Sequence, residues 1–176
     1  AAMPDAELRD LVRSKLADVK GVSYADIAAT ADSVGRTELA TMFLDFEPRA
    51  ADQVPLLLRM GASTVALGKA IDSGDSDLIN LALLHMKRTM TGAGREEEET
   101  EFFRKLLPYR EAVNLLIVYC RARDPPMLKR LYQAYGRYQD YATTYAKEAH
   151  AARALAERHE KLGYCEQVFA AGATKT

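Results

Sequence analysis

Apolar residues recur at steps of three and four positions along most of this chain, which is the spacing of one face of an α-helix. In the first such segment, which starts at Pro4 and Asp5 and stops before Gly21, the apolar positions are Leu8, Leu11, Val12, Leu16 and Val19. Pro and Asp favour the first turn of a helix, and Gly favours the position after its end. The pattern predicts an amphipathic helix over this segment.

The same spacing returns in short blocks, at about 23–34, 37–46, 52–60, 63–73 and 76–90, separated by two to five residues. Further helices are expected around 113–120 and 128–135, with a break at Pro125 and Pro126, and in one long run from about Arg137 to Leu162 that ends at Gly163. No block alternates apolar and polar residues as a half-buried strand would. The prediction is an all-α fold.

Short helices with tight connections are typical of an α-solenoid of short antiparallel helical hairpins. Residues 78–84 are apolar around most of a helix circumference, which requires neighbours on more than one side. We therefore expect residues 1–176 to form a single α-solenoid segment. Gly92 and Gly94, followed by the acidic run 96–99, predict a flexible loop at 91–100 or a frayed helix start within it.

The composition is that of a folded chain, and its net charge is close to zero. Hydrophobic residues make up 48% of the chain, and 24 Lys and Arg nearly balance 25 Asp and Glu. The net charge therefore does not direct the chain to nucleic acid or to an anionic membrane. No stretch approaches the ~20 apolar residues of a membrane span. Two cysteines make a poor disulfide framework, and we expect Cys120 and Cys165 to be reduced and buried.

No residue pattern indicates catalysis or a cofactor. The run from Gly61 to Gly68 and Lys69 differs from a phosphate-binding loop in its glycine spacing and in its following Ala. Asp75, after Gly74, fits a helix cap better than a calcium loop. The histidines are scattered, and no nucleophile lies in an elbow sequence. We expect neither an enzyme nor a metal or cofactor site.

Five tyrosines at steps of three or four are the most distinctive local feature, and they are Tyr132, Tyr135, Tyr138, Tyr141 and Tyr145. Such rings either pack the seam between adjacent helices or form an interface. A strip of small residues follows at Ala142, Ala149, Ala152 and Ala156 and predicts close helix packing.

A basic cluster overlaps the tyrosines and comprises Arg121, Arg123, Lys129, Arg130 and Arg137. One interpretation is a set of solvated or paired charges on helix faces. The alternative is a helical-repeat module that binds RNA or phosphoinositide through the stretch 121–145.

Several phrases resemble the C-terminal region of the vacuolar protein sorting-associated protein 16 family. They are the runs 22–28 (VSYADIA), 35–40 (GRTELA), 47–49 (EPR), 53–58 (QVPLLL) and 69–78 (KAIDSGDSDL). The match is close over residues 5–90 and thinner beyond them. It implies a fragment of a longer chain, with an N-terminal β-propeller and a solenoid that continues past Thr176.

The resemblance also implies a function. Members of this family are subunits of the HOPS and CORVET tethering complexes, which act in the cytoplasm on late endosomes and on the vacuole or lysosome. Their solenoid recruits the SM-family subunit, vacuolar protein sorting-associated protein 33, which helps SNAREs assemble for membrane fusion. The expected partners are that subunit and the other core subunits, with SNAREs reached indirectly, no nucleic acid, and membrane association only through the complex.

The phrase 169–174 (FAAGAT) resembles family sequence near the start of the SM-binding surface, so partner contacts are expected near the C-terminal end. The candidate contact residues are Arg153, Arg158, His159, Phe169 and Ala173. We expect the first three on the polar side of the last long helix and the last two after a break at Gly163.

Overall fold

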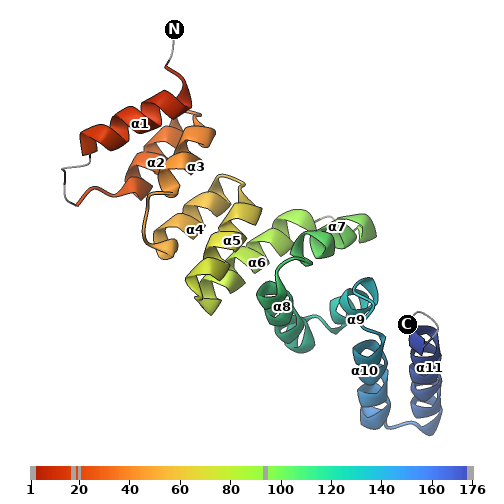
Figure 1. Ribbon diagram of the computed structural model, residues 1–176. Coiled ribbons are helices and arrows are strands. Elements are labelled where there is room, and N and C mark those ends of the chain that lie inside the picture. The colour runs from red at the N-terminus through yellow and green to blue at the C-terminus, as the bar shows by residue number, and fades with distance from the viewer. Residues whose placement is uncertain (1–2, 17–18, 20, 93–94, 174–176) are drawn as a thin grey trace. The chain divides into compact units, whose positions relative to one another are not determined.

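A computed structural model describes residues 3–16, 19, 21–92 and 95–173, and over these ranges it contains eleven α-helices and no strand (Figure 1). The all-α prediction is confirmed. The chain divides into two compact units, residues 1–95 and 96–176. We describe each unit by itself, and the single continuous segment expected from the sequence stays a prediction.

The described residues of the first unit form six helices, and most of them pack on a helix that directly precedes or follows them in the chain. They are α1 (Asp5–Leu16), α2 (Tyr24–Ser33), α3 (Thr37–Leu44), α4 (Ala50–Arg59), α5 (Ser63–Ser73) and α6 (Ser76–Met90). Their bounds fall within a few residues of the predicted blocks. The periodic apolar positions therefore predict these helices well.

The core of the first unit is built from the periodic positions of α3 to α6. Its large, fully buried side chains are Phe43, Leu44, Val54, Leu57, Leu67, Leu83 and Met86. Helix α6 packs on α4 and α5, yet Leu81 and Leu84 remain 46% and 39% exposed. The expectation that α6 has neighbours on more than one side is confirmed, and these two side chains lie on the part of its circumference that remains open.

No residue of helix α1 is fully buried, and two arginine side chains connect it to the rest of the unit. Arg36, at the start of α3, pairs with Asp5 and donates a hydrogen bond to the carbonyl of Met3 at 2.8 Å. The guanidinium of Arg13 lies 4.7 Å from the centre of the Phe46 ring.

Helix ends in this unit follow the capping rules. Gly74 ends α5 with φ of 70°, a left-handed conformation that glycine adopts without strain. The carboxylate of Asp75 then accepts hydrogen bonds from the backbone N–H groups of Asp77 and Leu78, at 2.8 and 3.4 Å. The capping interpretation of Asp75 is confirmed. Lys69 pairs with Asp45 at 3.0 Å.

Two buried polar side chains join the turn after α3 to α2 and α4. Glu47 is 4% exposed, and its carboxylate accepts a hydrogen bond from the N–H of Ala25 in the first turn of α2, at 3.2 Å. Gln53 is 7% exposed and donates through Nε2 to the carbonyls of Leu44, at 2.8 Å, and Glu47. These residues belong to the phrases EPR and QVPLLL that carry the family resemblance. Their chemistry is structural, because they satisfy backbone groups that burial removes from water.

The second unit contains five helices around a core of Phe102, Leu106, Leu116, Met127 and Leu131. They are α7 (Glu96–Leu106), α8 (Arg110–Arg123), α9 (Pro125–Ala134), α10 (Tyr138–Ala151) and α11 (Leu155–Ala173). The predicted break lies at Asp124, between α8 and α9, and Pro125 and Pro126 form the first turn of α9, where Asp124 accepts from the N–H of Met127 at 3.2 Å. Proline suits that turn because its missing N–H has no partner there.

The loop predicted at 91–100 is shorter than expected, since α7 already begins at Glu96. Four glutamates occupy its first turn, where carboxylates interact favourably with the positive end of the helix dipole. Its last turns bury Phe102, Phe103 and Leu106. Residues 91, 92 and 95 lie between α6 and α7, and residues 93–94 lie outside the described part of the chain.

The long helix predicted from Arg137 to Leu162 is in fact two helices. The chain turns at Ala152, whose φ of −67° and ψ of 134° are extended, and the carbonyl of Ala152 accepts a hydrogen bond from Arg158 Nη2 at 3.0 Å. Gly163, the predicted stop, lies inside α11. The helix continues through it because α10 contacts α11 on both sides of that position, before it through the ion pair of Glu148 with Lys161 at 3.8 Å and after it through the Tyr164 ring.

Candidate partner-binding surface

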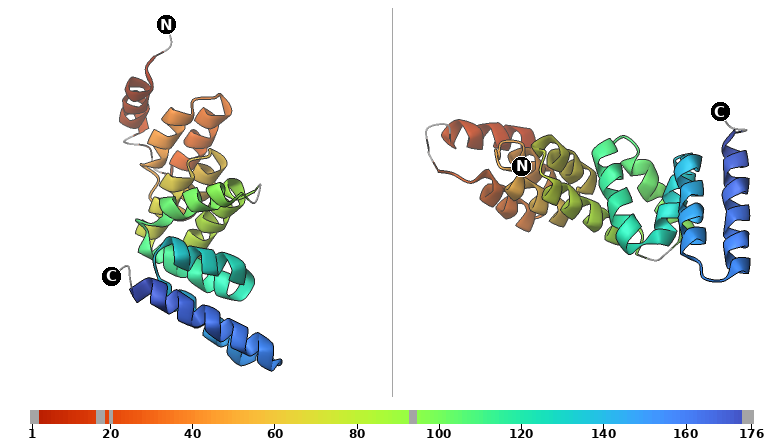
Figure 2. Two further views of the ribbon diagram at one scale, coloured as in Figure 1. Left: turned by 90° about the vertical axis from the view of Figure 1, so that its right-hand side faces the viewer. Right: turned by 90° about the horizontal axis from the view of Figure 1, so that it is seen from below.

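Helix α11 is the most exposed helix of the second unit. It packs along α10, and the two helices lie side by side in each view (Figure 2). No residue of α11 is buried. A long helix that covers its neighbour with one side and leaves the other side open is a natural place for a further contact.

Aromatic rings form the seam between α10 and α11. The rings of Tyr145 and Tyr164 stack with their centres 5.7 Å apart, and Tyr141 lies 5.4 Å from Tyr145. Desolvation by burial, and then the hydrogen bond to Tyr145, raise the pKa of Tyr141 to about 12. Tyr138 packs directly on Gly172, where an added Cβ would lie 2.7 Å from the Cβ of Tyr138. The interpretation of these tyrosines as seam residues is confirmed for this pair of helices.

The strip of alanines predicted to allow close packing is buried in part. Ala142, Ala149 and Ala152 are at most 8% exposed, whereas Ala156 is exposed. The strip ends where α10 ends, because the turn at Ala152 redirects the chain. The prediction is therefore wrong for Ala156.

An exposed flank of α11, beside its seam with α10, carries a row of large apolar side chains. Leu155 is 81% exposed, Leu162 44% and Phe169 48%. They are seven residues apart, close to two helical turns, so they point to the same side of α11. Exposed leucine and phenylalanine side chains in a row indicate a contact surface more strongly than single ones do. Sequence reasoning missed Leu155 and Leu162, although their spacing to Phe169 is visible in the sequence.

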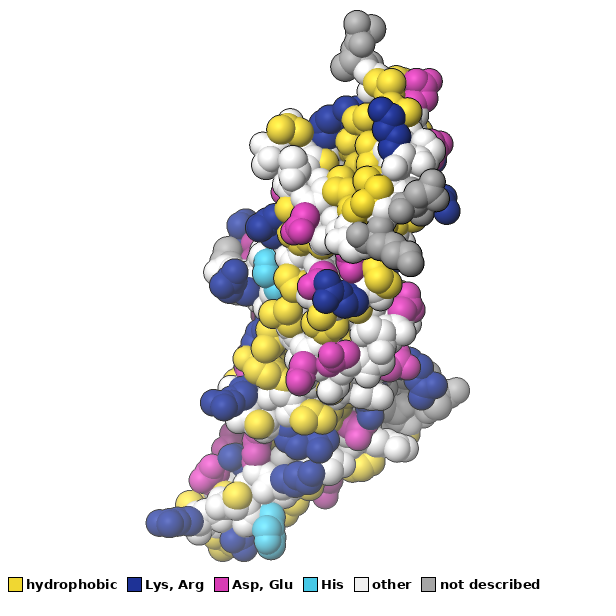
Figure 3. Space-filling model, turned by 90° about the vertical axis from the view of Figure 1, so that its left-hand side faces the viewer, with side chains coloured by type: hydrophobic (Ala, Val, Ile, Leu, Met, Phe, Trp, Pro, Cys, Tyr) yellow, Lys and Arg dark blue, Asp and Glu magenta, His cyan; other side chains and the backbone are white. Residues whose placement is uncertain are grey.

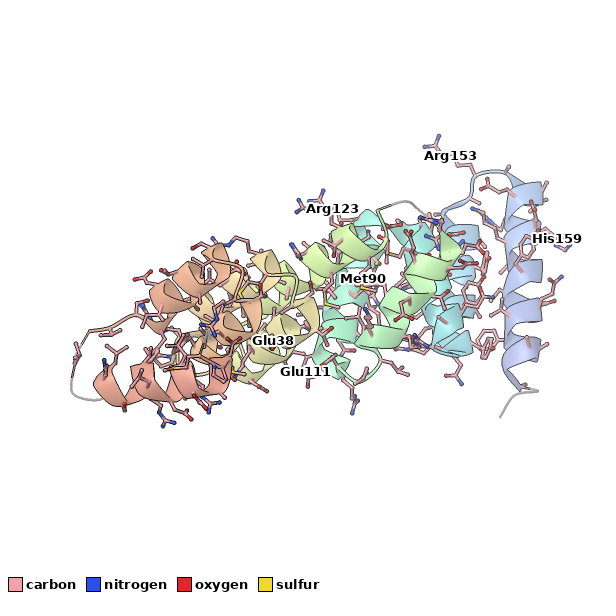
Figure 4. All side chains as sticks on the ribbon, turned by 90° about the horizontal axis from the view of Figure 1, so that it is seen from above. Glu38, Met90, Glu111, Arg123, Arg153 and His159 are labelled. Carbon is pink, nitrogen blue, oxygen red and sulfur yellow. The ribbon has the colours of Figure 1, made fainter. Side chains whose placement is uncertain are left out.

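The structure distributes the five candidate residues over the length of α11 and the turn before it, and all five are exposed. Arg153 lies in the α10–α11 turn, and Arg158 is tied to the carbonyl of Ala152. His159 projects from the side of α11 turned away from α10 (Figure 4). Its position in the helix places it beside the apolar row.

Phe169 and Ala173 are brought together near the end of α11. They line a hollow of about 530 Å³, whose other wall is the start of α10 from Gly136 to Asp140. The expectation that a break at Gly163 precedes them is wrong, because both continue the same helix. Arg153 and Arg158 belong to the opposite end of α11, so the five residues form no single cluster.

Most cations of the basic cluster form ion pairs with carboxylates inside the second unit. Arg130 binds the carboxylate of Glu99 through Nε and, at 3.0 Å, through Nη2, and this hydrogen bond is the main reason why the pKa of Arg130 is raised. Lys129 pairs with Glu148 at 2.8 Å. Arg137 pairs with Asp140 at 2.7 Å. Three of its five cations thus have an acidic partner.

The tyrosines beside these cations are also engaged. Tyr132 is 3% exposed, and Tyr135 donates its hydroxyl to the carbonyl of Phe103 at 2.8 Å. Desolvation raises the pKa of Tyr135 to about 12. Stacking on a nucleic acid base requires an exposed ring, which Tyr132 does not offer. On the face shown in Figure 3, Lys and Arg alternate with Asp and Glu rather than forming a basic stripe.

Three further observations concern chemistry. Within the described residues, no group of three or more His, Cys, Asp or Glu side chains is placed to hold a metal ion. None of the helices in that part of the chain is both long and apolar enough to cross a membrane. Cys120 is buried, as expected, whereas Cys165 is half-buried because α11 has an open side, and neither thiol forms a disulfide with another described residue.

Comparison with known proteins identifies relatives for most of the chain. The family model described as Vps16, C-terminal region, matches residues 22–176. A vacuolar protein sorting-associated protein 16 homolog of Dictyostelium discoideum is 40% identical over 148 residues, which are 84% of this chain and 17% of that protein. The protein VACUOLELESS1 of Arabidopsis thaliana is 36% identical over 146 residues, 83% of this chain and 16% of that protein.

A Drosophila melanogaster homolog is 46% identical over 72 residues, which are 41% of this chain and 9% of that protein. The chain thus spans about a sixth of the length of the Dictyostelium and Arabidopsis relatives. Because the family model covers residues 22–176, from α2 to α11, this chain belongs to the Vps16 family and corresponds to its C-terminal region.

Proposed function

We propose that this chain is a non-catalytic scaffold segment of an endosomal and vacuolar or lysosomal membrane-tethering complex of the HOPS and CORVET type. In that role it supports recruitment of the SM-family subunit, vacuolar protein sorting-associated protein 33, and contacts the other core subunits. SNAREs are reached indirectly, and the chain meets the cytoplasmic face of the membrane only through the complex. Family membership supports this proposal, together with relatives whose names record vacuolar protein sorting.

The observation that carries the proposal is the open side of α11. Leu155, Leu162 and Phe169 expose apolar surface in a row as long as the helix. Covering such side chains contributes about 1–2 kcal/mol each, since Leu162 and Phe169 are already about half covered and Leu155 is the most exposed of the three. Three of them supply a useful share of the binding free energy of a protein interface, in which a few apolar anchors dominate.

Ala173 offers a sharp test because it is small, exposed and next to Phe169 in the hollow at the end of α11. In the full-length protein, Ala173→Asp would place an unpaired carboxylate in the interface, at a cost of about 2–5 kcal/mol in binding. We expect it to abolish co-purification with the SM-family subunit and to leave helicity and melting temperature nearly unchanged.

Ala156→Asp is the matched control, because it adds the same side chain to an exposed alanine of α11. Position 156 lies about 100° around the helix from the row of Leu155, Leu162 and Phe169. We expect this variant to bind normally. Undiminished capture by the Ala173→Asp protein would show that the binding surface lies elsewhere.

An RNA- or phosphoinositide-binding function through residues 121–145 is less well supported. Lys129, Arg130 and Arg137 are paired with carboxylates. Binding of this kind would weaken steeply with salt. Filter binding to RNA and flotation with phosphoinositide liposomes, both at low salt, test it, and we expect neither to show binding.

A further inference from the structure

One group of cations in the second unit has no acidic partner among the described residues, and apart from Arg153 the function proposed above does not use it. Arg121 and Arg123 end α8, Lys147 lies in the second half of α10, and Arg153 lies in the turn before α11. All four are exposed. We call Arg121, Arg123, Lys147 and Arg153 the basic edge, and Figure 4 shows Arg123 and Arg153 projecting from the same side of the unit.

Two members of the basic edge meet in one hollow. Arg121 and Lys147 line a cavity of about 210 Å³ between α8, α9 and α10. The acid in its wall, Asp140, is already paired with Arg137 at 2.7 Å. The cavity therefore presents two positive side chains without a compensating carboxylate.

The remaining walls of this hollow suit a side chain that carries both charge and aliphatic carbon. The hydroxyl groups of Thr143 and Thr144 already donate to the carbonyls of Gln139 and Tyr141, both at 2.7 Å, so Arg121 and Lys147 are the groups of this hollow that donate to a carboxylate. Pro125 and Leu128 supply apolar surface. A glutamate or aspartate fits this combination, since its carboxylate pairs with Arg or Lys while its methylene groups contact carbon.

Local helix electrostatics explain only part of the basic edge. Arg121 and Arg123 lie in the last turn of α8, where cations interact favourably with the negative end of the helix dipole. Lys147 precedes the last turn of α10, and Arg153 lies outside any helix. A common reason for all four positions is therefore a ligand outside the unit.

We propose that the basic edge binds an acidic segment of a protein partner, with one carboxylate in the hollow between Arg121 and Lys147 and others along Arg123 and Arg153. A protein segment is favoured over a membrane surface because half of the charge lies in a hollow, into which an extended chain can place a side chain. The proposal does not depend on binding of the SM-family subunit by α11.

The test uses fluorescence anisotropy of a fluorescein-labelled oligoglutamate peptide with the purified chain. We expect saturable binding that weakens as salt is added, because these charges are exposed to solvent. The double variant Arg121→Glu/Lys147→Glu should weaken binding by about tenfold or more, since it places like charges opposite the peptide. An oligoglutamine peptide of equal length should not bind.

Arg110→Glu is the matched control, because Arg110 is an exposed arginine at the other end of α8. It should bind the acidic peptide like the unmodified chain. Equal affinity of the double variant and the unmodified chain would overturn the proposal. Binding to phosphatidylserine vesicles without binding to the peptide would also overturn it and would assign the basic edge to a membrane surface.

Discussion

The buried carboxylate of Glu47 gives the clearest prediction about stability. It accepts a hydrogen bond from the N–H of Ala25, which is only 8% exposed and has no helical partner in the first turn of α2. In a Glu47→Ala variant this N–H is left buried and unpaired, at a cost of about 1–3 kcal/mol. Loss of the negative charge near the start of α2 costs about 0.3–1 kcal/mol more.

The removal of a buried charge offsets part of this cost, because the carboxylate no longer has to be desolvated. We expect a net loss of about 2–3 kcal/mol in the free energy of unfolding of the first unit. For a unit of this size that loss lowers the melting temperature by about 10–20 °C. Glu47→Gln keeps one acceptor of the same shape and should lose about 1 kcal/mol.

Far-ultraviolet circular dichroism during heating and during urea titration measures both variants. Glu38→Ala is the matched control, since Glu38 is an exposed glutamate of α3 in the same unit. It should change the free energy of unfolding by no more than about 0.5 kcal/mol. If Glu47→Ala were as mild as that control, the account of Glu47 as the partner of α2 would be refuted.

Two other predictions concern the second unit. Gly172→Ala should lower the melting temperature, because its Cβ would lie 2.7 Å from the Cβ of Tyr138, and overpacking of this kind costs about 1–3 kcal/mol. Gly163→Ala should instead raise the free energy of unfolding by about 0.5–1 kcal/mol, because nothing lies within 4 Å of the added Cβ. A thermal melt in which both substitutions change the melting temperature in the same direction would contradict the packing of α11 on α10. Burial raises the pKa of Tyr135 to about 12, whereas a tyrosine in the unfolded chain ionises near 10. The unfolded chain therefore loses this proton first as pH rises. The free energy of unfolding should fall as pH rises from about 10 to 12. Urea denaturation of Tyr135→Phe across this range should show a smaller alkaline loss, and an unchanged pH dependence would contradict the burial of this hydroxyl.

Most of the helices were predictable because residues close to each helix end determine where the helix begins or stops. Gly74 and Asp75 end one helix and cap the next, and both signals act within a few residues of themselves. The start of α7 was not predicted, because its first turn consists of glutamates and its buried residues, such as Phe102, lie only in its later turns. The turn at Ala152 contains neither Gly nor Pro and is fixed by contacts such as that of Arg158, which a local pattern does not reveal.

The candidate surface was predictable only in location. The family resemblance indicated the C-terminal end, where α11 exposes Phe169 and Ala173. Ion pairs between residues far apart in the sequence, such as Arg130 with Glu99, 31 positions apart, decide which charges remain available to bind a ligand. Sequence spacing does not give these pairs, so the same basic cluster was compatible with solvated charges, internal pairs or a binding site.

Hydrogen exchange tests the central claim, that α11 is the surface through which this segment supports a partner. The full-length protein is exchanged alone and in complex with the SM-family subunit, and backbone protection is compared peptide by peptide. We predict that complex formation slows exchange most in Leu155–Ala173, because an amphipathic helix opens less often when its second side is covered. Unchanged exchange over α11, with new protection confined to other helices, would contradict the account.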